Sequence, residues 1–256
     1  MQISQVAAQL YTIRDFLKTP SEIAQSMQKI RAIGYESVQV SGMGAIEESE
    51  LNLILADNGL TCCATHESTK SLFETPQLVV ERLQKLDCKY TAVPSPGGYS
   101  IETLQDVNEY SLNIERAGKA LQAAGQVLTY HNHHLEFRKL DGKTILDHIY
   151  DSTDATVVQA EIDTYWVQFG GGDVVSWCEK LRNRLPLLHL KDYGITDDNK
   201  VNYCEVGQGN LEWKRIIAAA EKSGCEWFIV EQDTTPGDPF DSLRTSFDYI
   251  AEHLVS

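Results

Sequence analysis

Short apolar runs alternate along this chain with longer amphipathic runs. The short runs have the length of buried strands, and the longer ones have the spacing of helices that bury one face. Strands are predicted at Gln5–Gln9, Ser37–Val40, Thr61–Thr65, Tyr90–Val93, Val127–His131, Val157–Asp163, Leu187–Leu190 and Trp227–Glu231. Helices are predicted at Ser21–Ala32, Glu47–Asn58, Pro76–Leu86, Ile101–Ala124, Val174–Leu181, Leu211–Ser223 and Pro239–Leu254.

Glycines mark the ends of several predicted helices. Gly34, Gly59, Gly125 and Gly224 each follow a helix, and an apolar run begins one to three residues later. This order is typical of the loop from helix to strand in a repeating β/α unit. The 256 residues allow about 32 residues for each of eight units, as in a compact (β/α)8 barrel. We therefore predict an α/β protein with one TIM-barrel domain over residues 1–256.

A doubly wound open sheet is the alternative fold. That fold usually carries a glycine-rich phosphate-binding turn after its first strand. Here the corresponding segment reads TIRDFLKTP and contains no glycine. The barrel is therefore favoured.

Charge and cysteine usage narrow the function. The formal net charge is −15 and the pI about 4.8, with no basic cluster to offset them, which argues against a nucleic-acid partner. No apolar run approaches the roughly 20 residues that span a bilayer, and the N-terminus does not have the pattern of a signal peptide. The six cysteines form no C-x-x-C pair, so we expect reduced thiols in a cytoplasmic protein with no membrane partner.

Four short apolar runs, VLTYH, TVVQAEID, LPLLH and WFIVE, each end in a side chain that can bind a metal ion. These side chains are His131, Asp163, His189 and Glu231. Their spacing is close to the roughly 25–40 residues of one strand, one helix and two loops. We therefore expect them at the same ends of successive parallel strands, where the active site of a barrel lies. Two imidazoles and two carboxylates suit a catalytic divalent cation.

Further candidate residues lie beside these strand ends. His133 shares a strand face with His131, and Glu136 lies over the pocket or in solvent. Glu161 shares a face with Asp163, and two carboxylates inside a barrel need a cation, a basic side chain or a shared proton. Asp163 could instead cap the next helix, but Asp173 is better placed as an N-cap, of Val174–Leu181.

The remaining candidates would line the mouth of the barrel. Lys191 shares a face with His189 and either serves an anionic oxygen or lies on the surface. Trp166 offers a flat apolar wall of the kind found in sugar pockets, and His66 ends the third strand. Asn210 is a possible N-cap for the helix that follows it.

Five short blocks, in order, resemble the sugar phosphate isomerase/epimerase branch of the xylose isomerase-like TIM-barrel superfamily. They are YHNHHLEF, EIDTYWV, LHLKD, VGQGNLEW and VEQD. The resemblance implies one divalent metal ion (Mn, Co, Zn or Mg) held by residues from strands five to eight, which here are His131, Asp163, His189 and Glu231. In the ketose 3-epimerases of this superfamily a glutamate stands at the position of His131. The YHNH form is more similar to inosose dehydratase.

The resemblance implies a metal-dependent sugar isomerase or epimerase. It would remove a proton next to a carbonyl and pass through a metal-stabilised enediolate. Glu231 is the expected base, and His133, Glu136 or Lys191 would return a proton. His66, Trp166 and Glu161 are expected to bind substrate.

Two other functions stay open from the sequence. One is metal-dependent dehydration of a keto-polyol, as in inosose dehydratase, and the other is a sugar-binding barrel without catalysis. The expected partner is a small sugar or polyol, unphosphorylated because no phosphate-binding patch is evident. Barrels of this kind often form homo-oligomers.

Overall fold

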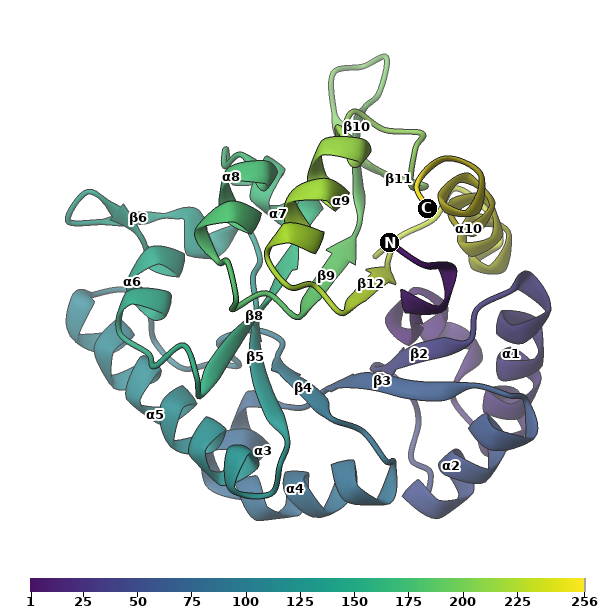
Figure 1. The fold of residues 1–256 in the computed structure, drawn as a ribbon, viewed down its shortest axis with the longest axis horizontal. Coiled ribbons are helices and arrows are strands. Elements are labelled where there is room, and N and C mark those ends of the chain that lie inside the picture. The colour runs from purple at the N-terminus through teal and green to yellow at the C-terminus, as the bar shows by residue number, and fades with distance from the viewer. Residues whose placement is uncertain (256) are drawn as a thin grey trace.

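Eight parallel strands close into a barrel in the computed structural model, which describes residues 1–255 (Figure 1). The strands are β1 (Val6–Gln9), β2 (Ser37–Val40), β3 (Thr61–His66), β4 (Tyr90–Val93), β5 (Val127–His131), β8 (Val158–Asp163), β9 (Leu187–Leu190) and β12 (Trp227–Val230). They lie side by side in chain order, and β12 pairs with β1 to close the ring. The predicted (β/α)8 barrel is confirmed.

The predicted strands match the observed ones closely. β2, β4, β5 and β9 have the predicted bounds, and the other four differ by one residue at one end.

The register between neighbouring strands determines which chemically important residues lie at the same level along the barrel axis. Asp163 on β8 pairs with His189 on β9, whereas His131 on β5 pairs with Glu161, two residues before Asp163. Glu231 follows β12 directly, and its N–H donates to the carbonyl of Leu190.

Helices surround the barrel and largely follow the predicted pattern. Each predicted helix is present, with ends that differ by at most three residues: α1 (Pro20–Ile33), α2 (Glu48–Asp57), α4 (Pro76–Lys85), α5 (Leu104–Ala123), α8 (Val174–Lys180), α9 (Trp213–Lys222) and α10 (Pro239–His253). Capping boxes begin α1 and α5, at Thr19 with Glu22 and at Thr103 with Asp106. Gly34 and Gly125 adopt positive φ, which explains the glycine between helix and strand.

Several short elements were not predicted. They are α3 (Thr69–Glu74), α6 (Ile145–Asp151), α7 (Thr164–Phe169), the hairpins β6 (Lys139–Leu140) with β7 (Lys143–Thr144) and β10 (Asp192–Ile195) with β11 (Val201–Cys204), and the 3-10 turns η1 (Ile3–Gln5), η2 (Leu10–Phe16) and η3 (Leu135–Phe137). The N-cap predicted at Asn210 is wrong, because α9 begins at Trp213 with Glu212 in the cap position. The N-cap predicted at Asp173 is confirmed, since its carboxylate accepts the N–H of Ser176 at 2.8 Å.

Apolar side chains fill two regions. The larger core lies between the strands and the surrounding helices, and a smaller cluster contains Ala7, Cys63, Ala64, Tyr90, Leu187 and Ile229. In the smaller cluster, Tyr90 and Leu187 begin their strands, so it lies toward the amino ends of the strands. The metal-binding candidates lie at the opposite, carboxyl ends of the strands.

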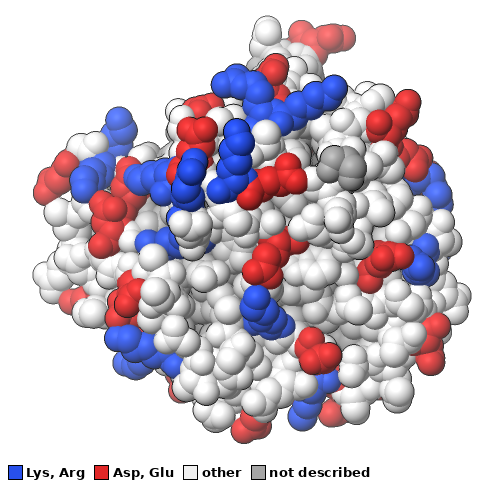
Figure 2. All heavy atoms as spheres, in the orientation of Figure 1, with Lys and Arg blue, Asp and Glu red and all other residues white. Residues whose placement is uncertain are grey.

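The surface carries charges of both signs, and the cysteines are reduced, as the sequence predicts. Figure 2 shows acidic and basic side chains interspersed on one face of the molecule. All six cysteines are free, and five of them are buried. Within residues 1–255, no helix is both long and apolar enough to cross a membrane.

Candidate metal centre

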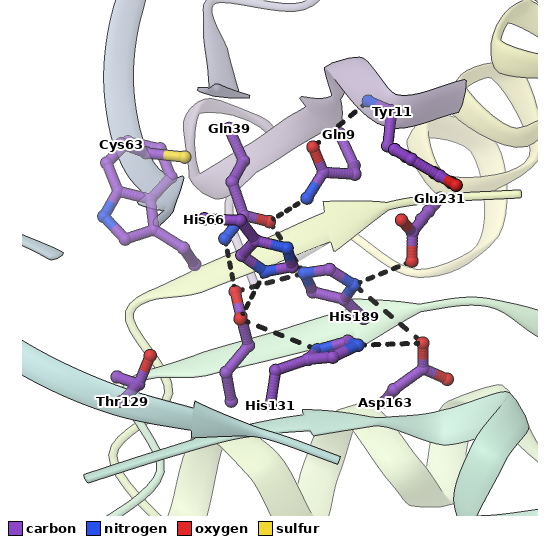
Figure 3. A network of polar contacts seen from close by, with 12 residues as sticks. Gln9, Tyr11, Gln39, Cys63, His66, Thr129, His131, Asp163, His189 and Glu231 are labelled. Carbon is purple, nitrogen blue, oxygen red and sulfur yellow. Dashed lines mark hydrogen bonds and ion pairs between the residues drawn. The ribbon is translucent and has the colours of Figure 1, made fainter. Parts of the chain in front are cut away.

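The four predicted metal ligands converge at the carboxyl ends of β5, β8, β9 and β12. His131, Asp163, His189 and Glu231 each present one nitrogen or oxygen atom, and these atoms all lie within 4.8 Å of one another. All four side chains are buried. Figure 3 shows the imidazoles of His131 and His189 beside the carboxylates of Asp163 and Glu231, which lie on the same side of the two rings. Residues 100 positions apart in the chain are thus brought together as the spacing of the strands predicts.

The atoms of this cluster suit a divalent cation. Asp163 Oδ2 lies 3.9 Å from both His131 Nε2 and His189 Nδ1. Glu231 Oε2 lies 3.1 Å from His189 Nδ1. Asp163 Oδ2 is buried and forms an ion pair with Lys191 Nζ at 3.4 Å, but it has no hydrogen-bond partner among the described residues. A buried carboxylate oxygen without a hydrogen bond is costly, and a cation would satisfy it. Two imidazole nitrogens and two carboxylate oxygens are a donor set that Zn²⁺ or Mn²⁺ accepts.

Asp163 caps a helix and also turns an oxygen toward the cluster, two positions that the sequence offers as alternatives. Its Oδ1 accepts the N–H of Trp166 at 3.0 Å and so caps α7. Its other oxygen faces the histidines. The sequence favoured Asp173 over Asp163 as a helix cap, but the structure shows that both cap a helix. The cap fixes the rotamer of Asp163, which holds Oδ2 in the cluster.

Lys191 is a buried cation beside the cluster. Its Nζ lies 3.1 Å from Glu231 Oε2, 3.4 Å from Asp163 Oδ2 and 2.6 Å from Asp233 Oδ2. Burial alone would lower the pKa of Lys191, but the three carboxylates outweigh it and hold that pKa well above its ordinary value. Lys191 is therefore a permanent positive charge, and the alternative of a surface lysine is wrong.

The two carboxylates of the cluster differ in acidity. Burial raises the pKa of Asp163 to about 6 despite the nearby Lys191. Burial would also raise the pKa of Glu231, but Lys191 and His189 outweigh it and hold that pKa well below its ordinary value. Glu231 is therefore ionised throughout the physiological range.

The histidines of the site also differ in pKa. Burial lowers the pKa of His189, but Glu161 and Glu231 on its two sides outweigh burial and raise that pKa to about 10. Burial, followed by the neighbouring His189, holds the pKa of His131 well below its ordinary value. Burial and Lys191 lower the pKa of His133 to about 4. His131 and His133 are therefore neutral at pH 7, and each ring has a nitrogen lone pair that can bind a metal ion or accept a proton.

A cavity of about 340 Å³ opens above the cluster. It is lined by Tyr11, Ser41, His66, Glu67, Ser68, Pro94, Ser95, His131, His133, Lys191, Glu231 and Asp233. This volume fits a small ligand, and the polar lining offers hydrogen-bond partners from many sides. Of the residues expected to act on substrate, His66, His133, Lys191 and Glu231 are thus brought to one cavity.

Trp166 and Glu161 do not line the cavity. The half-buried ring of Trp166 lies 5.4 Å from the ring of His133 and 5.1 Å from Lys191 Nζ, both of which line the cavity. Glu161 is fully buried and accepts hydrogen bonds from His66 Nε2 at 2.8 Å and Gln39 Nε2 at 2.5 Å. Both residues therefore contact residues that line the cavity, and their expected role in binding substrate stays a prediction.

Glu136 also lies away from the cavity. It is fully buried, which excludes solvent, and it is not among the residues that line the cavity, so both expected positions are wrong. One oxygen accepts the hydroxyl of Tyr130 at 2.8 Å, and the other accepts the N–H of His133 at 2.9 Å. These bonds tie the loop after β5 to the outer face of the strand. Glu136 thus fixes the backbone of His133.

Several residues of the site were not predicted. Gln39 contacts the cluster from β2, where its Oε1 lies 2.7 Å from His189 Nε2. The sequence does indicate Gln39, because it is an amide between two valines, Val38 and Val40, in a short predicted strand. Ser41, Ser68 and Ser95 in the lining follow strands as single small polar residues, which carry no signal in one sequence.

Comparisons with known proteins agree with this architecture. The family model described as xylose isomerase-like TIM barrel matches residues 27–253. The chain is 25% identical over 223 residues to an inosose dehydratase of Bacillus thuringiensis (strain Al Hakam), covering 74% of each protein.

Solved structures show the same fold. A sugar phosphate isomerase/epimerase from Parabacteroides distasonis superposes with a TM-score of 0.83 at 22% identity, covering 98% of this chain and 95% of the other. A D-allulose 3-epimerase from Methylomonas sp. superposes with a TM-score of 0.72 at 11% identity, covering 98% of each. At these identities the likeness concerns the fold.

Proposed function

The chain belongs to the xylose isomerase-like TIM barrel family, and from this premise we propose that it is a divalent-metal-dependent enzyme acting on a sugar or polyol ketone. The proposed reaction removes the proton on the carbon next to the carbonyl. The observation that carries the proposal is the cluster of His131, Asp163, His189 and Glu231 at the floor of a cavity of about 340 Å³.

These four residues would hold the metal ion. When bound, the ion supplies Lewis acidity toward the oxygens of the substrate. Lys191 adds a fixed positive charge at the same place, because three carboxylates keep it protonated. Negative charge that develops on a substrate oxygen during proton removal would be stabilised by this ammonium group.

Glu231 is the proposed base. Its Oε2 is engaged by His189 and Lys191, whereas no hydrogen bond to its Oε1 is found among the described residues. The residue lines the cavity, so an oxygen is available to a substrate. His133 is neutral and also lines the cavity, which suits it to carry a proton to or from the substrate. Lys191 is held by three carboxylates, Asp163, Glu231 and Asp233, so we assign it an electrostatic role.

The charge of the cavity favours an uncharged substrate. Glu67, Glu231 and Asp233 line it, and Lys191 is already engaged by carboxylates. A phosphate group would approach these carboxylates without a free cation in the described lining to receive it. We therefore propose a free sugar or polyol ketone rather than a sugar phosphate.

Dehydration is the second candidate function. After proton removal, return of the proton to carbon gives isomerisation or epimerisation, whereas loss of a β-hydroxyl gives dehydration. The match to an inosose dehydratase supports the second outcome. So does His131, since a neutral imidazole there replaces the acid that a second proton transfer would use in the related epimerases.

Deuterium incorporation tests the proposal. Purified protein with added Mn²⁺ is incubated in heavy water with a panel of neutral ketoses and an inosose, and the products are followed by NMR. We expect deuterium at the carbon next to the carbonyl, or a dehydrated product with its ultraviolet absorbance. Glu231→Gln should lose this activity and keep the circular dichroism of the wild type.

Two results would contradict the proposal. Full exchange by Glu231→Gln would remove Glu231 as the base. Saturable binding of a ketose by the wild type, with neither exchange nor dehydration, would indicate a sugar-binding barrel.

A further inference from the structure

A row of buried amides and a carboxylate lies beside the metal centre. Gln9 on β1, Gln39 on β2 and Glu161 on β8 are all fully buried. Figure 3 shows Gln9 and Gln39 leading from the backbone of Tyr11 toward the two imidazoles. None of the three lines the cavity, so none is placed to contact the substrate. Buried polar groups of this kind are costly unless they are paired, and here they pair with one another.

The hydrogen bonds in this row have one possible direction. The backbone N–H of Tyr11 can only donate, and it donates to Gln9 Oε1 at 3.3 Å. Gln9 Nε2 therefore donates to Gln39 Oε1 at 2.7 Å, and Gln39 Nε2 donates to Glu161 Oε1 at 2.5 Å. Turning the Gln39 amide over would set two donors face to face at Gln9 and two acceptors face to face at Glu161.

His189 contacts Gln39 and Glu161 through its Nε2 atom. Nε2 lies 2.7 Å from Gln39 Oε1 and 3.1 Å from Glu161 Oε1. Both oxygens are acceptors, so Nε2 carries a hydrogen. A neutral imidazole with its hydrogen on Nε2 has its lone pair on Nδ1. That atom faces Glu231 Oε2 at 3.1 Å and Asp163 Oδ2 at 3.9 Å, inside the metal centre.

His131 is arranged in the same sense. Its Nδ1 lies 3.6 Å from Glu161 Oε2, and its Nε2 lies 3.9 Å from Asp163 Oδ2. Each ring thus turns one nitrogen toward Glu161 and the other toward the metal centre. A histidine that binds a metal generally donates its second ring N–H to a carboxylate or carbonyl, which fixes its orientation.

We propose that Gln39, held in place by Gln9, acts with Glu161 as a positioning device that keeps the hydrogen of His189 on Nε2 and presents Nδ1 to the cation. This inference rests on the proposed function, because it assumes a cation at the four strand ends. It assigns Glu161 as an orienting carboxylate, although Glu161 also lies in a second group of possible ligands with His66, His131 and His189. In that group, Gln39 Nε2 and His189 Nε2 both point donors at Glu161, which opposes a cation there.

The test combines ring-nitrogen NMR with Zn²⁺ titration of the whole protein. In the wild type we expect a protonated Nε2 on His189 both without metal and with Zn²⁺, and a metal-bound Nδ1 after Zn²⁺ is added. Gln39→Met should weaken Zn²⁺ binding by roughly 10- to 100-fold, the usual effect of removing a residue that orients a ligand. Hydrogen exchange at His189 Nε2 should also become faster.

Gln126→Met is the matched control. Gln126 is a buried amide that donates to the carbonyl of Val80 at 3.0 Å, in the loop before β5 at the other end of the barrel. Its replacement should disturb folding in a comparable way and leave Zn²⁺ affinity and the His189 signals unchanged. If Gln39→Met does not fold, the wild-type spectra still test the inference, because they show which nitrogen of His189 is protonated and which binds Zn²⁺.

An unprotonated or Zn²⁺-bound Nε2 on His189 would overturn the inference while leaving the proposed function intact. So would wild-type affinity in Gln39→Met, or a second equivalent of Zn²⁺ that disappears in Glu161→Gln. A wild type that binds no divalent metal would instead contradict the proposed function, and with it any role of this device toward a cation.

Discussion

His189 lies between two carboxylates, with Glu161 on the side of Nε2 and Glu231 on the side of Nδ1. In the metal-free protein this raises its pKa to about 10, so at pH 7 both ring nitrogens carry hydrogen. A cation can bind Nδ1 only after that hydrogen leaves. Metal binding and proton release are therefore linked at this one residue.

Metal affinity should accordingly rise with pH. Because His189 holds the extra proton at every pH below about 10, each binding event near pH 7.5 should release about one proton, and affinity should increase about tenfold per pH unit. Below about pH 6, Asp163 is also protonated, so the dependence should become steeper. Calorimetric titration with Mn²⁺ in two buffers of different ionisation enthalpy counts the protons. Binding without proton release would contradict this description of His189.

Sequence and structure agree at the residues that end strands. His131, Asp163, His189 and Glu231 were predictable because spacing alone places the ends of parallel strands together. The roles of Gln39 and Glu161 were not, because they depend on contacts across the barrel between β2, β8 and β9. Glu136 was misplaced for the same reason, since its partner Tyr130 points outward from β5.

At the scale of elements, the helices of ten or more residues were predicted, whereas of the shorter ones in residues 1–255 only α8 was, with Asp173 as its N-cap. Six- and seven-residue helices such as α3 and α6 are too short to show a repeat of apolar positions. α7 was hidden for another reason, because it begins directly after β8 without a loop, and its N-cap is also a candidate metal ligand. The hairpin of β10 and β11 is an addition to the β/α repeat, so the repeat does not predict it.

Asp192 organises the segment between this hairpin and α9. Its fully buried carboxylate accepts the N–H groups of Gly207 at 2.8 Å, Gly209 at 3.1 Å and Leu211 at 3.2 Å, and the indole Nε1 of Trp213 at 2.7 Å. A side chain on Gly209 would collide with Asp192 Oδ1, since the added Cβ would lie 2.4 Å from it. This explains why the VGQGN segment needs a glycine beside Asp192.

Asp192→Asn should destabilise the protein by about 3 kcal/mol. The new amide turns an NH₂ group toward buried donors, which leaves them unpaired. Chemical denaturation measures the effect. Asp197→Asn, on the exposed tip of the same hairpin, is the control and should change stability by less than about 0.5 kcal/mol. Equal stability of the two variants would show that the carboxylate does not hold the segment.

At the scale of the whole molecule, the two halves of the barrel contribute differently. The second half, from β5 to β12, supplies the four proposed ligands. The first half supplies Gln9 and Gln39, which lie beside these ligands, and His66, which lines the cavity. It also supplies the small polar residues that line the cavity, Ser41, Ser68 and Ser95. The closed ring holds the two halves in register, so the site needs the complete barrel.

A bound cation would join strands that are adjacent in the ring but far apart in the chain. It would therefore stabilise the folded barrel, by about 2.7 kcal/mol at a metal concentration one hundred times its dissociation constant. If the four residues form only a hydrogen-bonded network, added metal should not stabilise the protein.

The most direct test of the metal centre compares two aspartates with the same structural role. Asp163 and Asp173 both cap short helices through one carboxylate oxygen, but only Asp163 turns its other oxygen to the cluster. Asparagine keeps the capping oxygen in both variants, so both should fold. Zn²⁺ titration of the metal-free proteins measures stoichiometry and affinity.

We expect one equivalent of Zn²⁺ per chain for the wild type and for Asp173→Asn. For Asp163→Asn, binding should be weaker by more than about 100-fold, because losing a ligand costs more than losing a residue that orients one. Binding by Asp163→Asn with the stoichiometry and affinity of the wild type would contradict the metal centre described above.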